Sequence, residues 1–415
     1  MAETVGLQPL SVRLRELVQV FTKLGTIGFG GPQAHIAMQN DEAVVRRSWL
    51  TPDQFTDGLA VCEMLPGPAS TQMGIYIGYV RAGQVGALVA GLAFITPAFL
   101  IVLFLSWAYF KFQTVPQLAA LFFGVSPVMI AIILGFCWKL APKAIQDGLG
   151  GAIALVIFSL SLWGNLNVLL LFILAGLIGL WLYGPRRPRG LPPQILSGAF
   201  VPLAIGNSFL AAVSPAVLSL SGFWGAERIG TFFWPLLSFF LKVGTLIFGG
   251  GLVIIPLLEF EVVERLGWLT HTEFLNGVAI GQLSPGPVVL TAAFVGYKVA
   301  GVLGALVATI GIFVPSFAFI MAGAPLLLKL RQNAWIKSFL KGVKPAVLGA
   351  IAAATVPLGR SAFLQPTLLL TGLAVLICLI ALVGLIRFKL PTWQLVLGGA
   401  ASGLLLGAVP LLELG

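Results

Sequence analysis

One apolar segment occurs twice in this chain, 219 residues apart. Residues 21–32 read FTKLGTIGFGGP, and residues 240–251 read FLKVGTLIFGGG. A duplicated hydrophobic unit that glycine and proline interrupt is typical of secondary transporters, whose substrate sites lie where the repeats meet. At the same offset, WLT occurs at 49–51 and 268–270, and Pro-Gly-Pro at 66–68 and 285–287. Further along, the offset becomes 218, and Gly78, Gly83, Gly86 and Pro97 match Gly296, Gly301, Gly304 and Pro315.

The composition indicates the solvent in which these repeats fold. Hydrophobic residues make up 58% of the chain and charged residues 9%, whereas a soluble domain has about 25% charged residues. Stretches such as 85–110, 166–183 and 367–386 are nearly free of charge, and about 20 such residues span a bilayer as a helix. We therefore predict an all-α polytopic membrane protein that contacts the lipid bilayer.

Several functional classes lack the residues that they require. The cysteines (Cys62, Cys137 and Cys378) are far apart, and two histidines cannot form a metal site alone, so we predict neither a disulfide framework nor a metal. No nucleophile–base pair or phosphate-binding loop appears, which argues against an enzyme and against a cofactor. We interpret the net charge of +10 mainly as basic cytoplasmic loops, without a sign of nucleic-acid binding.

Basic residues alternate between loops in opposite phase in the two halves. The segment 329–344 carries five lysines and arginines, whereas the matching segment 111–126 carries only Lys111. Conversely, Arg186, Arg187 and Arg189 close the first half, whereas the second half ends near Glu413. By the positive-inside rule, the two repeats are expected to have inverted orientations.

This pattern predicts a topology of thirteen crossings. We expect six crossings in a first repeat at 1–189, one in a linker at 190–228, and six in a second repeat at 229–415, with a cytoplasmic N-terminus. Arg46 and Arg47 fit this poorly, because a crossing by residues 17–39 would place them outside. Either that segment re-enters the membrane, or this loop is an exception to the rule.

Each repeat has a glycine-rich break inside an apolar segment. Glycine permits positive φ and proline cannot continue the preceding helix, so the helix is expected to unwind there. In lipid, unwound backbone persists only where it is buried in protein or lines a wet cavity, which favours a functional break over a helix-packing patch. The candidate substrate-binding residues at these breaks are Gly30, Gly31 and Pro32 in the first repeat and Gly249, Gly250 and Gly251 in the second.

The Pro-Gly-Pro motifs predict hairpins of half-helices. Thr51 is expected to cap a helix over 52–65, and Thr270 with Glu273 forms a capping box. The motif ends that helix, and its second proline begins another at 68–81 or 287–300. The N–H groups at such a helix start form an anion site that suits a small tetrahedral oxyanion, whereas the alternative is a simple turn outside the membrane. The candidate substrate-binding residues here are Pro66, Gly67, Pro68, Pro285, Gly286 and Pro287.

Polar side chains beside the breaks are further candidates. Lys23 and Lys242 precede the glycine clusters and are proposed to bind the anion, although such lysines also snorkel to the interface. Glu63, whose counterpart is Gln282, is the candidate for proton coupling, with a role in capping the break as the alternative. The other candidate substrate-binding residues are Gln33, His35, Thr71, Gln72 and Ser284, whereas Glu259, Glu261 and Glu264 are interpreted as loop and cap residues.

The doubled pattern GxFGGP, WLT and PGP resembles the long-chain chromate ion transporter (CHR) superfamily over nearly the whole chain, residues 12–184 and 231–412. The resemblance implies an inner-membrane carrier of bacteria and archaea that exports chromate, is driven by the proton gradient and also interacts with sulfate. It also implies antiparallel halves and thirteen crossings. The second repeat has Gly251, Leu252, Ile254 and Gln282 where the first has Pro32, Gln33, His35 and Glu63, so we expect the polar chemistry mainly in the first half.

Two other functions remain open at this point. One is a carrier of sulfate or another tetrahedral oxyanion, and the other is an anion channel built on the same repeats. The sequence also leaves a homodimer open.

Overall fold

The computed structural model describes residues 8–163, 166–184, 222–247, 252, 254–330 and 334–408. These residues form helices and loops without a β-strand among them, and five of the helices are long and apolar enough to cross a membrane. Most of the linker at 190–228, where one crossing is predicted, lies outside the described residues.

The first half contains α1 (Leu10–Ile27), α2 (Gly31–Asn40), the π-helical turn η2 (Asp41–Arg46), α3 (Pro52–Met64), α4 (Ala69–Phe112), α5 (Pro116–Ala144), α6 (Gly148–Trp163) and α7 (Val168–Tyr183). The second half contains α8 (Ala226–Gly244), α9 (Ile254–Leu258), the π-helical turn η6 (Glu259–Arg265), α10 (His271–Leu283), the 3₁₀ turn η7 (Val288–Leu290), α11 (Thr291–Leu330), α12 (Ala334–Phe363), α13 (Leu368–Ile386) and α14 (Thr392–Gly407).

α1 and α2 form a hairpin whose tip is the first glycine cluster. Near the tip, Lys23 of α1 forms an ion pair with Glu42, which follows α2, at 2.9 Å. Near the open end, Arg81 contacts Glu16 of α1 at 2.7 Å and lies over the ring of Trp49 at 5.3 Å. The chain therefore doubles back between these two pairs of contacts.

This hairpin bears on the predicted crossing at 17–39. The segment is not one straight helix, because α1 ends at Ile27 and α2 begins at Gly31. Arg47 lies over the ring of Trp49 at 5.4 Å, as Arg81 does, so it is at the same end of the hairpin as the start of α1.

A second hairpin contains the Pro-Gly-Pro motif of the first half. The predicted cap of α3 is confirmed, because Thr51 accepts a hydrogen bond from the N–H of Gln54 at 3.2 Å. α3 ends and α4 begins on either side of the motif, as predicted. In the second half the capping box of Thr270 and Glu273 is confirmed as well. There the helix after the motif differs slightly, because it starts with the 3₁₀ turn η7.

α4 and α11 each consist of two arms that turn back on each other. The backbone leaves the helical region at Ala82 and Gly83 in α4, and at the equivalent Ala300 and Gly301 in α11. The arms of α4 touch backbone to backbone, because a Cβ on Gly78 would collide with the carbonyl of Gly86. Gly296 and Gly304 make the same contact in α11. Small residues let membrane helices approach this closely, which explains why these glycines occur in both repeats.

The remaining helices of each half pack against helices of the other half. α5 of the first half packs against α13 and α14 of the second, whereas α12 packs against α6 and α7 of the first. Glycine contacts hold these pairs, with Gly124 against the backbone of Gly403 and Gly179 against Gly342. The halves are therefore interlocked.

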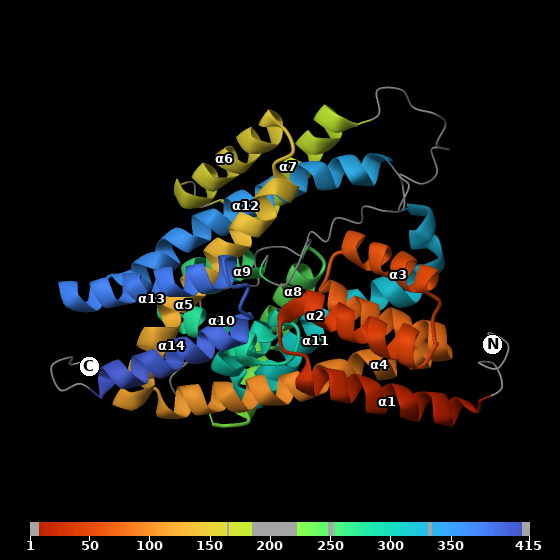
Figure 1. Ribbon diagram of the computed structural model, residues 1–415, viewed down its shortest axis with the longest axis horizontal. Helices are drawn as coiled ribbons and strands as arrows, with labels where there is room; N and C mark the ends of the chain where they lie inside the picture. The colour runs from red at the N-terminus through yellow and green to blue at the C-terminus, as the bar shows by residue number, and fades with distance from the viewer. Residues whose placement is uncertain are drawn as a thin grey trace.

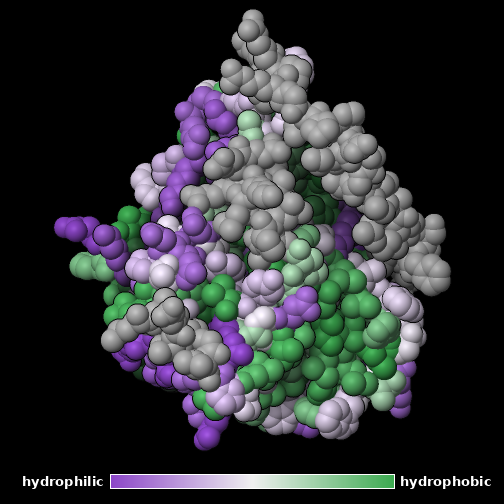
Figure 2. Space-filling view, turned by 90° about the vertical axis from the view of Figure 1, so that its right-hand side faces the viewer, coloured by the Kyte–Doolittle hydropathy of each residue, from purple (hydrophilic) through white to green (hydrophobic). Residues whose placement is uncertain are grey.

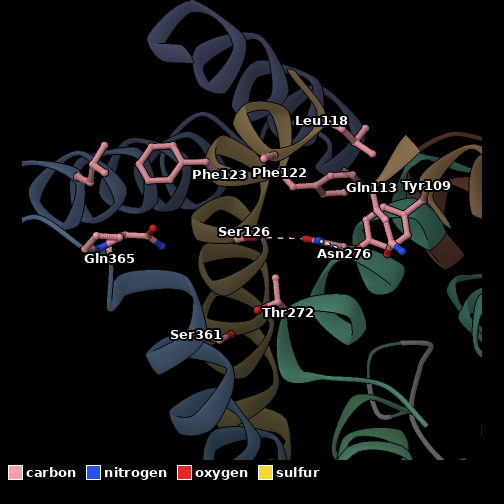
Figure 3. Close-up of a pocket in the computed structure, with 13 residues that line it drawn as sticks. Tyr109, Gln113, Leu118, Phe122, Phe123, Ser126, Thr272, Asn276, Ser361 and Gln365 are labelled. Atoms are coloured by element: carbon pink, nitrogen blue, oxygen red, sulfur yellow. Dashed lines mark hydrogen bonds between the residues drawn. The ribbon is translucent and has the colours of Figure 1, made fainter. Parts of the chain in front are cut away.

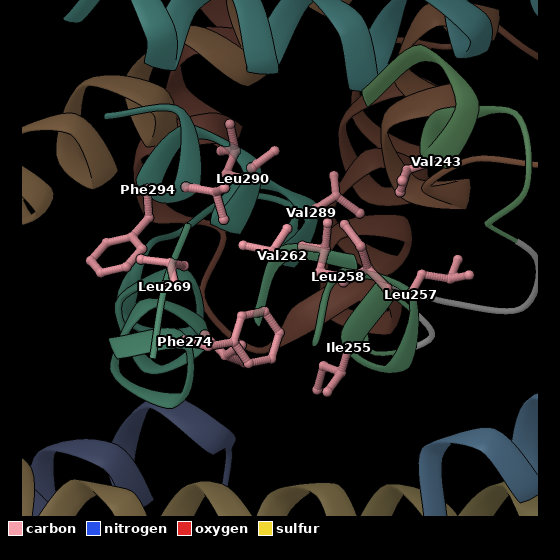
Figure 4. Close-up of a cluster of buried hydrophobic side chains, with 14 of the residues drawn as sticks. Val243, Ile255, Leu257, Leu258, Val262, Leu269, Phe274, Val289, Leu290 and Phe294 are labelled. Atoms are coloured by element: carbon pink, nitrogen blue, oxygen red, sulfur yellow. The ribbon is translucent and has the colours of Figure 1, made fainter. Parts of the chain in front are cut away.

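Apolar side chains from α8 to α11 fill the interior of the second half (Figure 4). Val262, Phe274 and Leu290 are fully buried within this cluster. The same cluster includes Met129 of α5 and Phe172 of α7, so the two repeats share one core.

The start of α1 and the end of α14 lie at opposite ends of the longest axis (Figure 1). Figure 2 looks onto the end that carries the start of α1, where hydrophilic side chains gather beside a hydrophobic surface. Five apolar helices in a shared core are the arrangement of a multi-pass membrane protein.

Candidate functional site where the hairpin tips meet

The Pro-Gly-Pro motif of each half adjoins the glycine-rich break of the other half. The N–H of Gly67 donates to the carbonyl of Ile247, just before the second break, at 2.7 Å. A Cβ on Gly28, in the first break, would lie 2.9 Å from the carbonyl oxygen of Pro285. Gly28 and Ile247 occupy equivalent positions in the repeat. These two contacts bring the Pro-Gly-Pro motifs and the glycine-rich breaks of both repeats together, and we call this region the hairpin tips. Gly67 and Pro285 are buried in the protein.

Gly67 lies in a position that accepts only glycine. Its φ of 129° is one that L side chains rarely adopt. A Cβ there would also collide with the amide nitrogen of Gln72 and with the hydroxyl of Ser316, which belongs to α11 of the other half. At the equivalent Gly286, the neighbour is the methyl group of Ala98. The tip of the first half is thus the one that faces a hydroxyl group.

Several polar atoms of the first-half hairpins and of Ser316 are buried without a hydrogen-bond partner among the described residues, and the Gln72 and Ser316 side chains lie against Gly67. The unpartnered atoms are the hydroxyls of Thr71 and Ser316, the carbonyl oxygen of the Gln72 side chain and that of the Gln39 side chain. All four side chains are at least 99% buried. A buried polar group without a partner costs about 1–3 kcal/mol, so such a group in a native fold calls for an explanation, and a ligand supplies one.

The start of α4 adds backbone donors at the same place. Pro68 precedes the helix, and its carbonyl already accepts from the N–H groups of Thr71 and Gln72 at 2.9 and 3.0 Å. The N–H groups left for a ligand are those of the two preceding residues, Ala69 and Ser70. The N–H groups of the first helical residues have no acceptor within their own helix, and the positive end of the helix dipole lies here. Hydroxyls and N–H groups at a helix start are the donors that an oxyanion requires.

His35 connects the two hairpins of the first half. Its Nε2 donates to the carbonyl of Gly28, so its Nδ1 accepts from the hydroxyl of Ser70 at 3.3 Å. Gln39 donates to the carbonyl of Ser70 at 3.0 Å. Both nitrogens of His35 therefore have protein partners, and the ring holds the glycine-rich break of the first half against α4.

Some predicted site residues lie away from this buried group. Lys23 is half exposed and donates to Glu42 at 2.9 Å. This hydrogen bond is the largest cause that lowers the pKa of Glu42 below its usual value, and Arg47 assists at 3.2 Å. Glu63, Gln33 and Lys242 are exposed. Glu63, the candidate for proton coupling, thus lies on the outer face of α3.

In the second half the polar groups near the tip have partners. Ser284 donates to the carbonyl of Gly281 at 2.8 Å, and Gln282 accepts from Thr392 at 3.2 Å. Gly249, Gly250 and Gly251 lie outside the described residues. Of the four unpartnered side chains described above, three belong to the first half, and the fourth, Ser316, belongs to the second. Sequence reasoning missed Ser316, although comparing the repeats position by position shows a serine after Pro315 where Ala98 follows Pro97.

An acidic cluster with a histidine lies before α10. Sequence reasoning interpreted Glu259, Glu261 and Glu264 as loop and cap residues, which is wrong, because all three belong to η6, and Glu259 and Glu261 are buried. His271 lies between Glu259 and Glu264, with one ring nitrogen 3.2 Å from each carboxylate. These three side chains place potential ligand atoms within 4.8 Å of one another, and the two contacts of His271 account for the arrangement without an ion.

The histidine of this cluster predicts a pH-dependent stability. The hydrogen bond to Glu259 raises the pKa of His271, and burial raises the pKa of Glu259. Since the folded pKa of His271 exceeds its unfolded value of about 6.5, protonated His271 stabilises the fold below that pH, and the contribution is lost as pH rises through the folded pKa. We expect His271→Gln to lower the melting temperature in detergent at acidic pH and to have little effect at alkaline pH. An equal effect at every pH would contradict this origin of the stability.

The crossed hairpins and the paired helix breaks define a class of protein, a polytopic membrane transporter with its candidate site between two repeats. The model of the chromate transporter family matches residues 15–180 and 234–404, so the chain belongs to this family. Both repeats are covered by these matches.

Curated relatives agree with the family. The chromate transport protein of Cupriavidus metallidurans is 36% identical over 94% of this chain and 92% of its own length. A probable chromate transport protein of Synechococcus elongatus is 36% identical over 88% of this chain and 89% of its own, and the chromate transport protein of Pseudomonas aeruginosa is 31% identical over 94% and 91%. These relatives are named transport proteins and not enzymes. No solved structure matches the chain.

Proposed function

We propose that this protein exports chromate across the inner membrane, that export is coupled to protons, and that the oxyanion binds where the hairpin tips meet. The observation that carries the proposal is the buried, unpartnered Ser316 hydroxyl against Gly67 on the boundary between the repeats, with a second unpartnered hydroxyl, that of Thr71, at the start of α4. Chromate is the substrate that the names of the relatives give for those proteins. Sulfate has the same tetrahedral shape and charge, and a carrier of sulfate is the alternative.

The donors fit a small tetrahedral dianion. The Ser316 hydroxyl lies against Gly67 from the other repeat, and the start of α4 contributes the Thr71 hydroxyl and the N–H groups of Ala69 and Ser70. Hydrogen bonds from several directions bind such an ion with little room for a larger one. Because Ser316 and Thr71 belong to different halves, a movement of one repeat against the other would separate the donors and release the ion, as alternating access requires.

We also propose a topology for the hairpins in the bilayer. If each hairpin enters the membrane and returns, the first half keeps an even number of crossings, with four in place of the six predicted. Arg46 and Arg47 then lie on the same side as Arg13, which removes their conflict with the positive-inside rule. Inverted repeats would place the hairpins of the second half on the opposite side, with the tips of both in the middle.

Glu63 is proposed to carry the coupled proton, and its exposed position on α3 would let it meet water in a transport pathway. We expect chromate flux in membrane vesicles to respond to an imposed pH gradient in the wild type, and Glu63→Gln to retain flux but lose this response. Asp53→Asn, a matched change of an exposed carboxylate on the same helix, is expected to behave as the wild type.

The outcomes of the vesicle experiment separate the candidates. Wild-type chromate flux that does not depend on the pH gradient but is proportional to the membrane potential would indicate an anion channel. Sulfate uptake that outcompetes chromate would indicate the alternative carrier. A Glu63→Gln protein with normal coupling would remove Glu63 from the proposal.

A further inference from the structure

A cavity of about 340 Å³ lies between the two halves, away from the hairpin tips (Figure 3). α4 and α5 of the first half form one side, whereas α10, α12 and the loop that follows α12 form the other. Figure 3 shows polar side chains from both halves, among them Ser126, Thr272, Asn276 and Gln365, turned toward this space. None of the residues that line the cavity is charged.

Three buried side chains in its wall form a chain of hydrogen bonds. Ser126 donates to the side-chain oxygen of Asn276 at 3.4 Å, and the amide nitrogen of Asn276 donates to the hydroxyl of Tyr109 at 3.2 Å. Each of the three is more than 90% buried. The bonds join α5, α10 and α4, so the wall is held by both repeats.

These hydrogen bonds leave some N–H and O–H groups free to bind a ligand in the cavity. An amide nitrogen carries two hydrogens, and Asn276 uses one of them on Tyr109. The Tyr109 hydroxyl accepts in this bond, so its own hydrogen is available, and no acceptor for it occurs among the described residues. The hydroxyl of Thr272 lies beside them. The carboxylate of Glu273, which acts on Tyr109, does not line the cavity and is paired with Lys298 at 2.7 Å. The donors that line the space are therefore neutral and suit an anion better than a cation.

The same helices lead from the cavity to the tips. Asn276 lies seven residues before the end of α10 at Leu283, about 10 Å at 1.5 Å per residue, and Gly286 follows three residues later. Tyr109 lies eleven residues after Ala98, which touches Gly286, so α4 covers a similar distance. Between them the walls are apolar, with Val102 and Ile280 buried in the shared core. The cavity and the tips are therefore separate spaces in this conformation, joined by two common walls.

We propose that this cavity is a transit site for the transported oxyanion, at the end of the pathway away from Arg13 and Arg81. The proposal rests on the proposed function and adds a second binding place to it. A transit site has to bind strongly enough for entry and weakly enough for release, and neutral donors without a lysine or arginine meet both conditions. Asn276 and Tyr109 would hold the ion, and Ser126 would orient Asn276.

The first test changes the charge of the cavity. Asn276→Asp places a carboxylate there, and we expect the KM for chromate to rise at least about tenfold, the effect of about 1.4 kcal/mol. Asn276→Ala keeps the cavity neutral and should raise KM by less, with the same direction. Gln146→Glu adds the same charge on an exposed loop away from the cavity and is the control that should leave KM unchanged.

A second test does not depend on the charged variant folding. In a protein whose three cysteines are replaced and that still transports chromate, Thr272→Cys is labelled by an anionic thiol reagent in detergent. We expect chromate to slow this labelling and to leave that of Gln146→Cys unchanged, which also controls for oxidation of the thiol by chromate.

Two results would overturn the transit site while the proposed function stands: wild-type KM in both Asn276 variants, or labelling of Cys at position 272 that chromate does not slow. A wild-type protein without oxyanion flux would instead overturn the proposed function itself. The cavity would then hold water or a lipid headgroup, which labelling in the presence of inorganic phosphate would test.

Discussion

Gly67→Leu is expected to abolish chromate transport while the protein remains in the membrane, and Gly67→Ala is expected to reduce transport at least about tenfold. A residue with a side chain at a φ of 129° is strained, and the added carbon would collide with Gln72 and Ser316. Backbone strain of this kind and overpacking each cost about 1–3 kcal/mol. To relieve the collision, the Gln72 and Ser316 side chains have to turn away from the tip or α11 has to move. Either change removes the close approach on which the oxyanion site depends. Chromate flux in vesicles, normalised to the amount of protein, measures the effect.

Gly267→Ala is the matched control for this variant. Gly267 also has a positive φ, of 60°, but a Cβ there would meet no atom within 4 Å. It therefore tests a side chain at positive φ without the collision and should retain most of the flux. Normal transport by Gly67→Ala would exclude the tip of the first half as the binding place.

Ser316→Ala is expected to raise the Kd for chromate about tenfold to a hundredfold without loss of stability. A hydrogen bond to a charged group contributes about 1.5–3 kcal/mol, and each 1.4 kcal/mol is a factor of ten in affinity. In the protein without a ligand, the Ser316 hydroxyl is fully buried and has no partner among the described residues, so its removal leaves no hydrogen bond unmade. The melting temperature should therefore stay the same or rise. Binding to the purified protein and thermal unfolding in detergent give the two quantities.

Ser106→Ala serves as the control for Ser316→Ala. Ser106 is equally buried, but its hydroxyl donates to the carbonyl of Val102 at 2.6 Å within α4. Its removal should leave the affinity for chromate unchanged. If Ser316→Ala lowers the melting temperature and leaves the affinity intact, then the hydroxyl is a structural group and does not belong to the site.

Local features of the fold were predictable because they depend on neighbouring residues. The helix start at Pro52, the capping box of Thr270 and Glu273, and the helix ends at both Pro-Gly-Pro motifs follow from backbone preferences of a few adjacent residues. The apolar spans follow from composition in the same way. The repeat itself then predicted that each feature would occur twice.

Features that depend on distant residues were predicted less well. The sequence leaves two alternatives for residues 17–39, because only the contacts of Arg81 with both Glu16 and Trp49 show that the chain turns back after α1. The position of Glu63 next to the break does not reveal that its side chain is exposed, because the face of α3 that it occupies is set by how α3 packs on α4. Glu259 and Glu261 were taken for loop residues, and packing buries them instead.

The sequence by itself determined that this chain is a duplicated, apolar, helical protein with paired helix breaks, and its repeated motifs indicated the family. These properties are encoded in residue type and spacing along the chain. Only the tertiary structure decided that Gly67 of one repeat meets Ile247 and Ser316 of the other, and which hydroxyls remain without a partner. The physical reason is that a contact between residues far apart in sequence depends on how whole helices pack, and local preferences do not specify that packing.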